Sequence, residues 1–172
     1  MKFIDLMMED FTDVIQFATA KHSGQTRKFD GKPYFTHPSR VAEIVKTVTK
    51  DKNSITAAYL HDTLEDTDAT EKEIVELFGK KVLSLVKELT SVMIKGDNKA
   101  EFLTKKMNGM SKDALLIKLA DRLDNVSDFP TAPRKFVDKY TKETEFILNN
   151  LKTNLNGKHK KLIKMIRQKL EQ

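Results

Sequence analysis

Apolar residues recur at intervals of three and four positions along nearly the whole chain. Residues with this spacing share one face of an α-helix, so the pattern predicts a series of amphipathic helices. No segment shows the alternation of apolar and polar residues, bounded by turn residues, that indicates a strand. We therefore predict an all-α fold without a sheet, an internal repeat or a low-complexity linker.

Loop residues mark the expected helix boundaries in the first third of the chain. A segment rich in Gly, Asp and Pro, residues 22–36, separates a first helix from a second. The second begins near His37-Pro38, because proline suits the first helical turn. A third helix is expected to carry residues 55–62. The first helix carries apolar residues at Phe3, Leu6, Met7, Val14, Phe17 and Ala18.

Capping residues mark the later boundaries. Thr70 and Glu73 have the spacing of a capping box, and Gly79 is suited to close the helix that they open. Ser111 is a candidate N-cap for a helix that extends past Leu123. The remaining predicted helices span about 80–91, about 99–107, and about 134–155, the last ended by Asn156-Gly157.

Length and composition predict one globular domain over 1–172. We expect its core at about 10–155 and a basic C-terminal helix at 158–171. With 39% hydrophobic and 33% charged residues, the chain is neither disordered nor membrane-spanning. It has no Cys, so any metal must be held by His and carboxylate groups. Because the N-terminus is acidic where a signal peptide would be apolar, we expect a cytoplasmic protein without a membrane partner.

The formal net charge of +6 favours an anionic partner, either nucleic acid or a phosphorylated small molecule. No aromatic residues lie among the basic residues near the C-terminus to stack on bases. We therefore interpret this segment as a solvated helix face, with His159 exposed, and consider a nucleic-acid partner unlikely. The basic residues are Lys158, Lys160, Lys161, Lys164, Arg167 and Lys169.

Four groups able to bind a cation or move a proton lie within six residues of the chain: His61, Asp62, Glu65 and Asp66. In a continuous helix, residues four apart stand one turn from each other. Crowded carboxylates repel one another without a cation, and a divalent metal reverses that effect. The segment therefore predicts a metal site.

Two residues elsewhere in the chain complete a candidate ligand set. His37 lies at a loop-to-helix junction, and Asp121 interrupts an otherwise apolar helix. With His61 and Asp62 they make a mixed nitrogen and oxygen shell, which suits one Mn²⁺, Fe²⁺ or Zn²⁺ ion better than Ca²⁺. Four protein ligands on an octahedral ion leave two positions for water and a substrate oxygen.

Each of these residues also has a simpler interpretation. His37 is compatible with a plain helix-start residue, and Asp121 with a surface ion pair to the adjacent Arg122. His22 has no neighbouring carboxylate in its loop and is interpreted as structural. The pair Arg27-Lys28 is compatible with an ordinary exposed basic pair. The recurrence of the same few residue types at separate places favours the metal site.

Several segments carry a resemblance to a known family. The order His37, His61-Asp62, Asp121 resembles the HD superfamily of metal-dependent phosphohydrolases. More specifically, the chain resembles the hydrolase half of the RelA/SpoT alarmone enzymes and their stand-alone, Mesh-type forms, from about residue 10 to about residue 155. The segments concerned are 24–28, 31–38, 60–66, 78–79, 118–125 and 139–144.

The resemblance implies a helical bundle of the HD type. It also implies Mn²⁺-dependent hydrolysis of the 3′-pyrophosphate of ppGpp or pppGpp, giving GDP or GTP and pyrophosphate. His37, His61, Asp62 and Asp121 then correspond to the metal ligands. Glu65 and Asp66 correspond to the acidic pair that orients or deprotonates water. Arg27, Lys28 and Asn125 correspond to residues that contact the guanosine nucleotide.

The sequence departs from the family pattern in two places. The loop Phe29–Lys32 has one more residue than the Ser-Gly-Glu common in the bifunctional enzymes, and Asp124 stands where His is frequent. Two alternatives therefore stay open: an HD phosphohydrolase for another nucleotide, such as NADPH, and a non-catalytic basic module for nucleic acid. The oligomeric state is left open as well.

Overall fold

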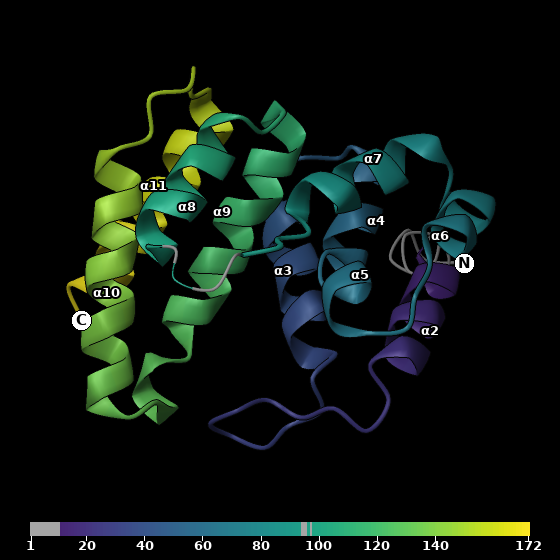
Figure 1. Ribbon diagram of the computed structural model, residues 1–172, viewed down its shortest axis with the longest axis horizontal. Coiled ribbons are helices and arrows are strands. Elements are labelled where there is room, and N and C mark those ends of the chain that lie inside the picture. Colours follow the sequence, from purple (N-terminus) through teal and green to yellow (C-terminus); the bar gives the residue numbers. More distant parts are fainter. Residues whose placement is uncertain (1–10, 94–95, 97) are drawn as a thin grey trace. The chain divides into compact units, whose positions relative to one another are not determined.

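The computed structural model describes residues 11–93, 96 and 98–172 (Figure 1). Their regular structure is helical, and the only pairing of strand type among them is the isolated bridge between Thr26 and Pro33. The predicted all-α fold is therefore confirmed over the described residues. Phe3, Leu6 and Met7 of the expected first helix lie outside them.

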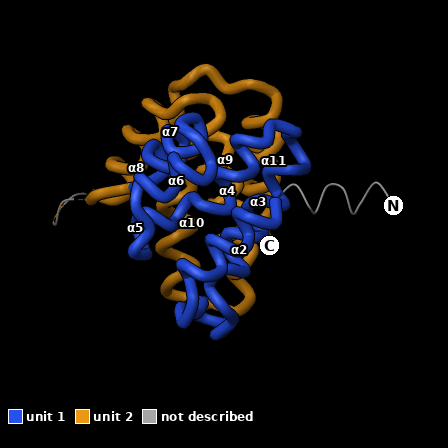
Figure 2. The backbone as a smooth tube through the Cα atoms, turned by 90° about the vertical axis from the view of Figure 1, so that its right-hand side faces the viewer, with its two compact units in different colours: residues 1–90 blue, residues 91–172 orange. Residues whose placement is uncertain are grey.

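The chain divides into two compact units, residues 1–90 and 91–172, which Figure 2 draws in separate colours. The single domain over 1–172, with its core at 10–155, stays a prediction. Each unit is described by itself below.

The helices of unit 1 gather around α4. This helix, Lys52–Leu60, packs against α2, α3 and α7, and α6 packs against α7. Its buried side chains include Ile55, Ala58, Tyr59 and Leu60, so it contributes a nearly continuous apolar face. The other helices of this unit are α2 Thr12–Lys21, α3 Thr36–Lys46, α5 Thr63–Asp66, α6 Glu71–Phe78 and α7 Lys80–Leu89.

In unit 2, α9 is the central helix. It spans Lys112–Ser127 and packs against α10 and α11, while α10 packs against α8. Buried residues such as Leu115, Ile117 and Leu119 give α9 apolar contacts on several sides. The other elements are α8 Lys99–Asn108, η1 Phe129–Thr131, α10 Arg134–Asn149 and α11 Gly157–Leu170.

Most predicted helix ends are confirmed by capping bonds. Thr70 and Glu73 form the reciprocal capping box, and Gly79 ends α6 with a φ of 88° that favours glycine. The Ser111 side chain accepts a hydrogen bond from the Ala114 amide at the start of α9. α3 begins at Thr36, one residue before His37.

The predicted helix through 55–62 was wrong at its C-terminal end. α4 ends at Leu60 and α5 begins at Thr63, so the His61-Asp62 pair lies in the turn between them. Two side chains bind carbonyls that a continuing helix would use: His61 Nδ1 lies 2.8 Å from the Ala58 oxygen, and Thr63 Oγ1 donates to the Leu60 oxygen at 2.8 Å. These local bonds compete with the next helical turn.

The end of the chain also differs from the prediction. α10 ends at Asn149, and Asn156 does not end a helix but caps α11 in a capping box with His159. His159 is completely buried rather than exposed, and its Nε2 lies 2.8 Å from the Lys112 carbonyl oxygen. The basic side chains of α11 are exposed, as expected for a solvated face.

Candidate active site

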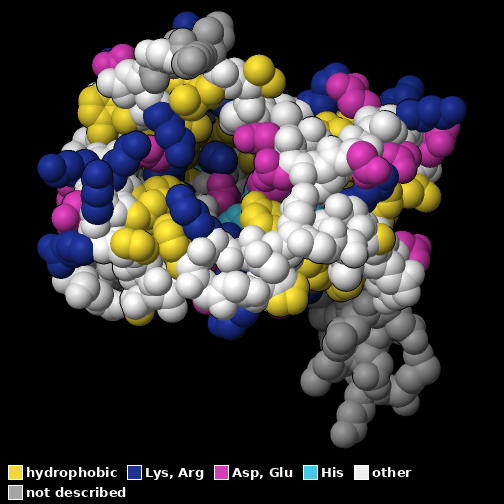
Figure 3. Space-filling model, turned by 60° about the horizontal axis from the view of Figure 1, so that its bottom comes forward, with side chains coloured by type: hydrophobic (Ala, Val, Ile, Leu, Met, Phe, Trp, Pro, Cys, Tyr) yellow, Lys and Arg dark blue, Asp and Glu magenta, His cyan; other side chains and the backbone are white. Residues whose placement is uncertain are grey.

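His37 and His61 are the two histidines of the predicted ligand set, and both lie in unit 1. His37 lies in the first turn of α3, where its backbone amide donates to the Tyr34 carbonyl oxygen at 2.9 Å. Each histidine is only 2% exposed. Only small histidine areas show on the face drawn in Figure 3, in keeping with this burial. The fold therefore holds both rings away from bulk solvent.

The contact between His61 and Ala58 determines which ring nitrogen carries the proton. A carbonyl oxygen only accepts, so Nδ1 of His61 must donate to Ala58 at 2.8 Å. In the neutral ring, Nε2 is then the atom with a lone pair. That atom lies 3.0 Å from Oδ1 of Asp62. A backbone contact thus presents the candidate ligand nitrogen to the carboxylate, and a backbone carbonyl is a usual partner for the other nitrogen of a histidine ligand.

Asp62 joins the two histidines. Its Oδ2 lies 3.7 Å from His37 Nε2 and accepts a 2.6 Å hydrogen bond from the Tyr34 hydroxyl. The His37 and His61 rings meet edge to face with centroids 5.1 Å apart, and their nearest candidate ligand atoms lie within 4.8 Å of each other. Two imidazoles and one carboxylate therefore converge within one unit.

This convergence fits a divalent cation. A lone pair of His61 facing a carboxylate at 3.0 Å is unfavourable by itself, because both groups are electron-rich. A cation among these atoms turns that arrangement into coordination. The nitrogen and oxygen donors, with no thiolate in the chain, match borderline transition metals.

The acidic pair lies directly after the cluster. Glu65 and Asp66 are exposed residues of the single-turn helix α5, and the Asp66 amide donates to the Asp62 carbonyl oxygen at 2.9 Å. Partial burial raises the pKa of Asp66, and the negative charges of Asp62 and Glu65 raise it further. His22 and His61 oppose this shift of the Asp66 pKa. One helical turn thus connects Asp62 to a pair of candidate proton acceptors.

The predicted basic pair lies on the loop between α2 and α3. Two backbone bonds close this loop, because the Arg27 amide donates to the Lys32 oxygen at 2.7 Å and the Gly31 amide donates to the Arg27 oxygen at 3.2 Å. Arg27 is half-buried with its guanidinium 6.0 Å from the centre of the Tyr34 ring. Lys28 is exposed beside Phe29. Arg27 therefore lies next to the residue that binds Asp62.

Asp121 and Asn125 lie in unit 2, on successive turns of α9. Asp121 is 7% exposed, and its Oδ2 accepts from Lys118 Nζ at 2.8 Å. Its Oδ1 accepts from Asn125 Nδ2, also at 2.8 Å. The ion pair that sequence reasoning assigned to Arg122 is therefore made by Lys118. Asn125 orients the carboxylate that was predicted to bind metal.

Sequence reasoning missed Tyr34, Gln25 and the connection that His22 makes to them. Tyr34 binds Asp62, and Gln25 Nε2 donates to the Asp66 carbonyl oxygen at 2.7 Å. The signal was present, since Gln25 and Tyr34 lie in the two loop segments with the family resemblance. Nothing in their spacing indicated that Tyr34 and Gln25 would reach residues 28 and 41 positions away.

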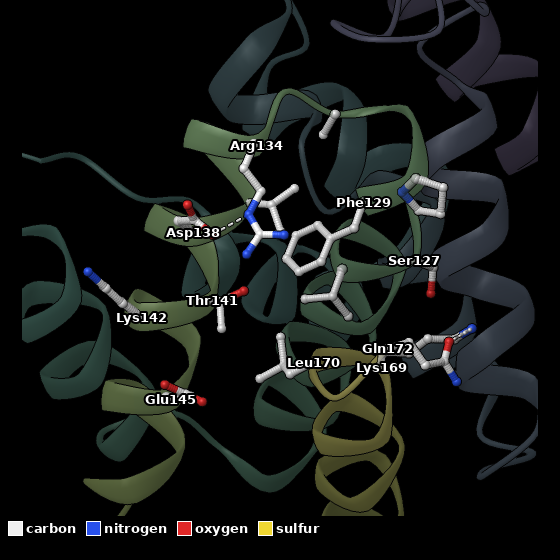
Figure 4. Close-up of a pocket in the computed structure, with 14 residues that line it drawn as sticks. Ser127, Phe129, Arg134, Asp138, Thr141, Lys142, Glu145, Lys169, Leu170 and Gln172 are labelled. Carbon is white, nitrogen blue, oxygen red and sulfur yellow. Dashed lines mark hydrogen bonds and ion pairs between the residues drawn. The ribbon is translucent and has the colours of Figure 1, made fainter.

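A pocket of about 750 Å³ lies in unit 2, among α9, η1, α10 and α11 (Figure 4). Phe129 and Leu170 contribute apolar surface, and Arg134 pairs with Asp138 at 2.9 Å. None of the site residues predicted from the sequence lines this pocket.

The protein-family model described as "HD domain" matches residues 15–157. The chain belongs to this family. Family membership agrees with the observed cluster, because the segment matched includes every candidate ligand in both units. A divalent metal is the cofactor that this family implies.

Curated relatives extend the comparison. The chain is 42% identical over 142 residues to a guanosine-3′,5′-bis(diphosphate) 3′-pyrophosphohydrolase of Aquifex aeolicus, covering 78% of this chain and 20% of that protein. It is 44% identical over 117 residues to GTP pyrophosphokinase rsh of Brucella ovis, covering 64% of this chain and 16% of that protein. The chain therefore spans a fifth or less of the length of these relatives.

Solved structures include one of similar length. A structure described as a metazoan ortholog of SpoT that hydrolyzes ppGpp is 32% identical, with a TM-score of 0.79, covering 92% of this chain and 94% of that one. The protein lmo0812 of Listeria monocytogenes has a TM-score of 0.65 at 22% identity and shares the fold.

Proposed function

We propose that this protein is a metal-dependent hydrolase that removes the 3′-pyrophosphate of ppGpp or pppGpp, giving GDP or GTP and pyrophosphate. The observation that carries the proposal is the cluster of the buried His37 and His61 with the half-buried Asp62, joined by one helical turn to Glu65 and Asp66. The named activities of the Aquifex relative and of the metazoan SpoT ortholog supply the substrate class.

The proposed ligands are His37, His61, Asp62 and Asp121, holding one Mn²⁺ ion, with Fe²⁺ or Zn²⁺ as the alternatives. The first three converge in unit 1. Asp121 is supported by its burial and by the two donors that hold its carboxylate in one orientation. A divalent cation bound by these ligands supplies Lewis acidity, which makes water more acidic and offsets phosphate charge.

The acidic pair is proposed to handle the proton of the attacking water. Glu65 and Asp66 are exposed, so water reaches them, and α5 connects them to Asp62. A carboxylate within hydrogen-bond reach of water can accept its proton as the bond to phosphorus forms. The negative charge of the neighbouring Glu65 helps to raise the pKa of Asp66.

Three residues are proposed to contact the nucleotide. Arg27 can make a two-pronged contact to a phosphate, and Lys28 supplies a point charge. Both cations would stabilise the departing pyrophosphate, whose negative charge grows as the bond breaks. Asn125 is the third, and its hydrogen bond to Asp121 links substrate binding to the ligand set.

The test is an assay with ppGpp and Mn²⁺, with products separated by ion-exchange chromatography. We expect GDP and pyrophosphate in equal amounts, and we expect a chelator to abolish their formation. Inorganic phosphate released from NADPH, with ppGpp left intact, would instead support the alternative nucleotide phosphohydrolase. Salt-sensitive binding of DNA or RNA that is indifferent to the chelator would support the basic binding module.

A cytoplasmic location belongs to the same proposal, because a cytosolic nucleotide would be the substrate. Among the described residues, no helix is both long and apolar enough to cross a lipid bilayer.

A further inference from the structure

His22 contacts two residues that lead to the active site, although sequence reasoning treated it as structural. It caps the C-terminus of α2 and is 2% exposed. Its Nδ1 lies 2.8 Å from Oε1 of Gln25, and its ring lies against the Tyr34 ring with centroids 4.9 Å apart. Gln25 and Tyr34 in turn hold Asp66 and Asp62.

The hydrogen bonds determine the tautomer of His22. Gln25 Nε2 donates to the Asp66 carbonyl oxygen at 2.7 Å, so the other end of the same amide, Oε1, is the atom that faces His22. An amide oxygen only accepts, and His22 Nδ1 must therefore carry the proton. Its Nε2 is buried without a hydrogen-bond partner. In the tautomer with its proton on Nδ1, this buried position holds only a lone pair.

The hydrogen bonds from His22 through Gln25 lead to α5, a helix that depends on contacts with residues outside it. α5 is a helix of four residues, Thr63–Asp66, and a single turn is marginal by itself. The carbonyl groups of its last residues have no partner within the helix. The Gln25 side chain binds one of them, the carbonyl of Asp66. Its own backbone is held as well, since the Tyr34 amide donates to the Gln25 oxygen at 2.9 Å.

We propose that His22 is a positioning residue for the hydrolytic reaction, which acts by donating from Nδ1 to Gln25 and thereby fixing the acidic turn that carries Glu65 and Asp66. Its effect on turnover rests on the proposed function, whereas the tautomer and the order of α5 do not. The unpartnered Nε2 makes the proposal specific, because only the Nδ1 side of the ring is used.

Three substitutions of His22 separate the two sides of the ring. The amide nitrogen of Asn stands where Nδ1 does, the amide of Gln stands where Nε2 does, and Phe keeps the ring contact with Tyr34 without a donor. His22→Asn should retain the bond to Gln25. His22→Gln and His22→Phe should lose it.

The first measurement needs neither metal nor substrate. In protein labelled with ¹⁵N-histidine, long-range ¹H–¹⁵N spectra should show His22 protonated at Nδ1 and not at Nε2. Hydrogen exchange of the Glu65 and Asp66 amides should be faster by about fivefold in His22→Phe and His22→Gln, the effect of one lost hydrogen bond. It should be near the wild-type rate in His22→Asn. Gln25→Met should reproduce the faster exchange.

The second measurement is steady-state hydrolysis of ppGpp. His22→Phe should lower kcat by about 10- to 100-fold, the range for a residue that orients a catalytic group, with KM unchanged. A general collapse of the loop would raise KM instead, because the loop carries Arg27 and Lys28. The double variant, which combines His22→Phe with Gln25→Met, should have a kcat no lower than that of the less active single variant. His159→Phe, at a buried histidine of unit 2, should leave kcat unchanged.

Several results would overturn the proposal: a proton on Nε2 of His22, unchanged exchange of α5 in His22→Phe, or rescue by Gln rather than Asn. If the wild-type protein leaves ppGpp intact, the proposed function fails, while the tautomer and the exchange rates still decide the role of His22.

Discussion

Both units bury ionisable side chains, and they do so in different surroundings. In unit 2, Arg122 lies within helix α9, where it donates to Glu143 at 3.0 Å and to Thr144 at 2.9 Å. Its guanidinium also covers the Tyr140 ring at 4.6 Å. The charges are opposite, and two guanidinium nitrogens meet acceptors while the buried Nε has no hydrogen-bond partner. Protein atoms alone therefore balance the charge of this network.

In unit 1 the buried polar side chains lie at the ends of helices. His37 begins α3, and the His61-Asp62 pair lies in the turn between α4 and α5. Here ring nitrogens face a carboxylate, an arrangement completed by a cation. The comparison teaches that burial alone does not mark a functional site. The chemistry of the facing groups does so, because imidazole nitrogens that face a carboxylate form a donor set for a cation.

The largest effect is expected from breaking the cluster of unit 1. Asp62→Ala removes the carboxylate that joins both histidines, so bound metal should be lost and activity should fall by at least about 10³-fold. Metal content by plasma mass spectrometry and ppGpp hydrolysis measure the two effects. The matched control is Asp138→Ala, an exposed aspartate of unit 2 paired with Arg134, which should change neither. Retention of the metal by Asp62→Ala would contradict the ligand assignment.

Breaking the network of unit 2 should affect stability rather than chemistry. Glu143→Ala leaves the buried Arg122 charge without its carboxylate, and the free energy of unfolding should fall by about 3 kcal/mol or more. Denaturant titration measures this. The double substitution Arg122→Met with Glu143→Leu should recover most of the loss, because no charge is then left buried. A loss well below 1 kcal/mol in the single variant would mean that water reaches Arg122.

The acidic turn tests whether unit 1 carries the proton transfer. Glu65→Gln should keep the metal and lower kcat by about 10²-fold, the range for losing a proton acceptor. Asp66→Asn tests the second carboxylate in the same way. Glu71→Gln on α6 is the control, and its kcat should be unchanged. Full activity in both Glu65→Gln and Asp66→Asn would show that water is activated by another group.

The smallest effects should be the same in both units. Thr70→Ala removes the N-cap of α6, and Asn156→Ala removes that of α11. Each should lower the free energy of unfolding by about 1 kcal/mol without changing kcat, because a cap is a local hydrogen bond. Thermal unfolding followed by circular dichroism measures both. Unequal losses would show that one cap carries a tertiary contact as well.

Local sequence patterns predicted much of the fold, but they predicted few of the contacts between residues of the candidate site. The capping box at Thr70 and the cap at Ser111 follow from side-chain bonds spanning three residues, and both were predicted. The interpretation of Asn156-Gly157 as a helix end was wrong, because the same pair caps a helix when an amphipathic segment follows it. The positions of Asp121 and Asn125 relative to the ligands of unit 1 stay a prediction.

The sequence by itself determined the helical class, most of the caps and the kinds of donor available to a metal. Periodicity and spacing are enough for these, since they depend on residues within one or two turns. Only the tertiary structure decided that His159 is buried against Lys112, that Tyr34 holds Asp62 and that Gln25 reaches Asp66. Those contacts join residues 28 to 47 positions apart, and they form only when packed helices bring distant segments together.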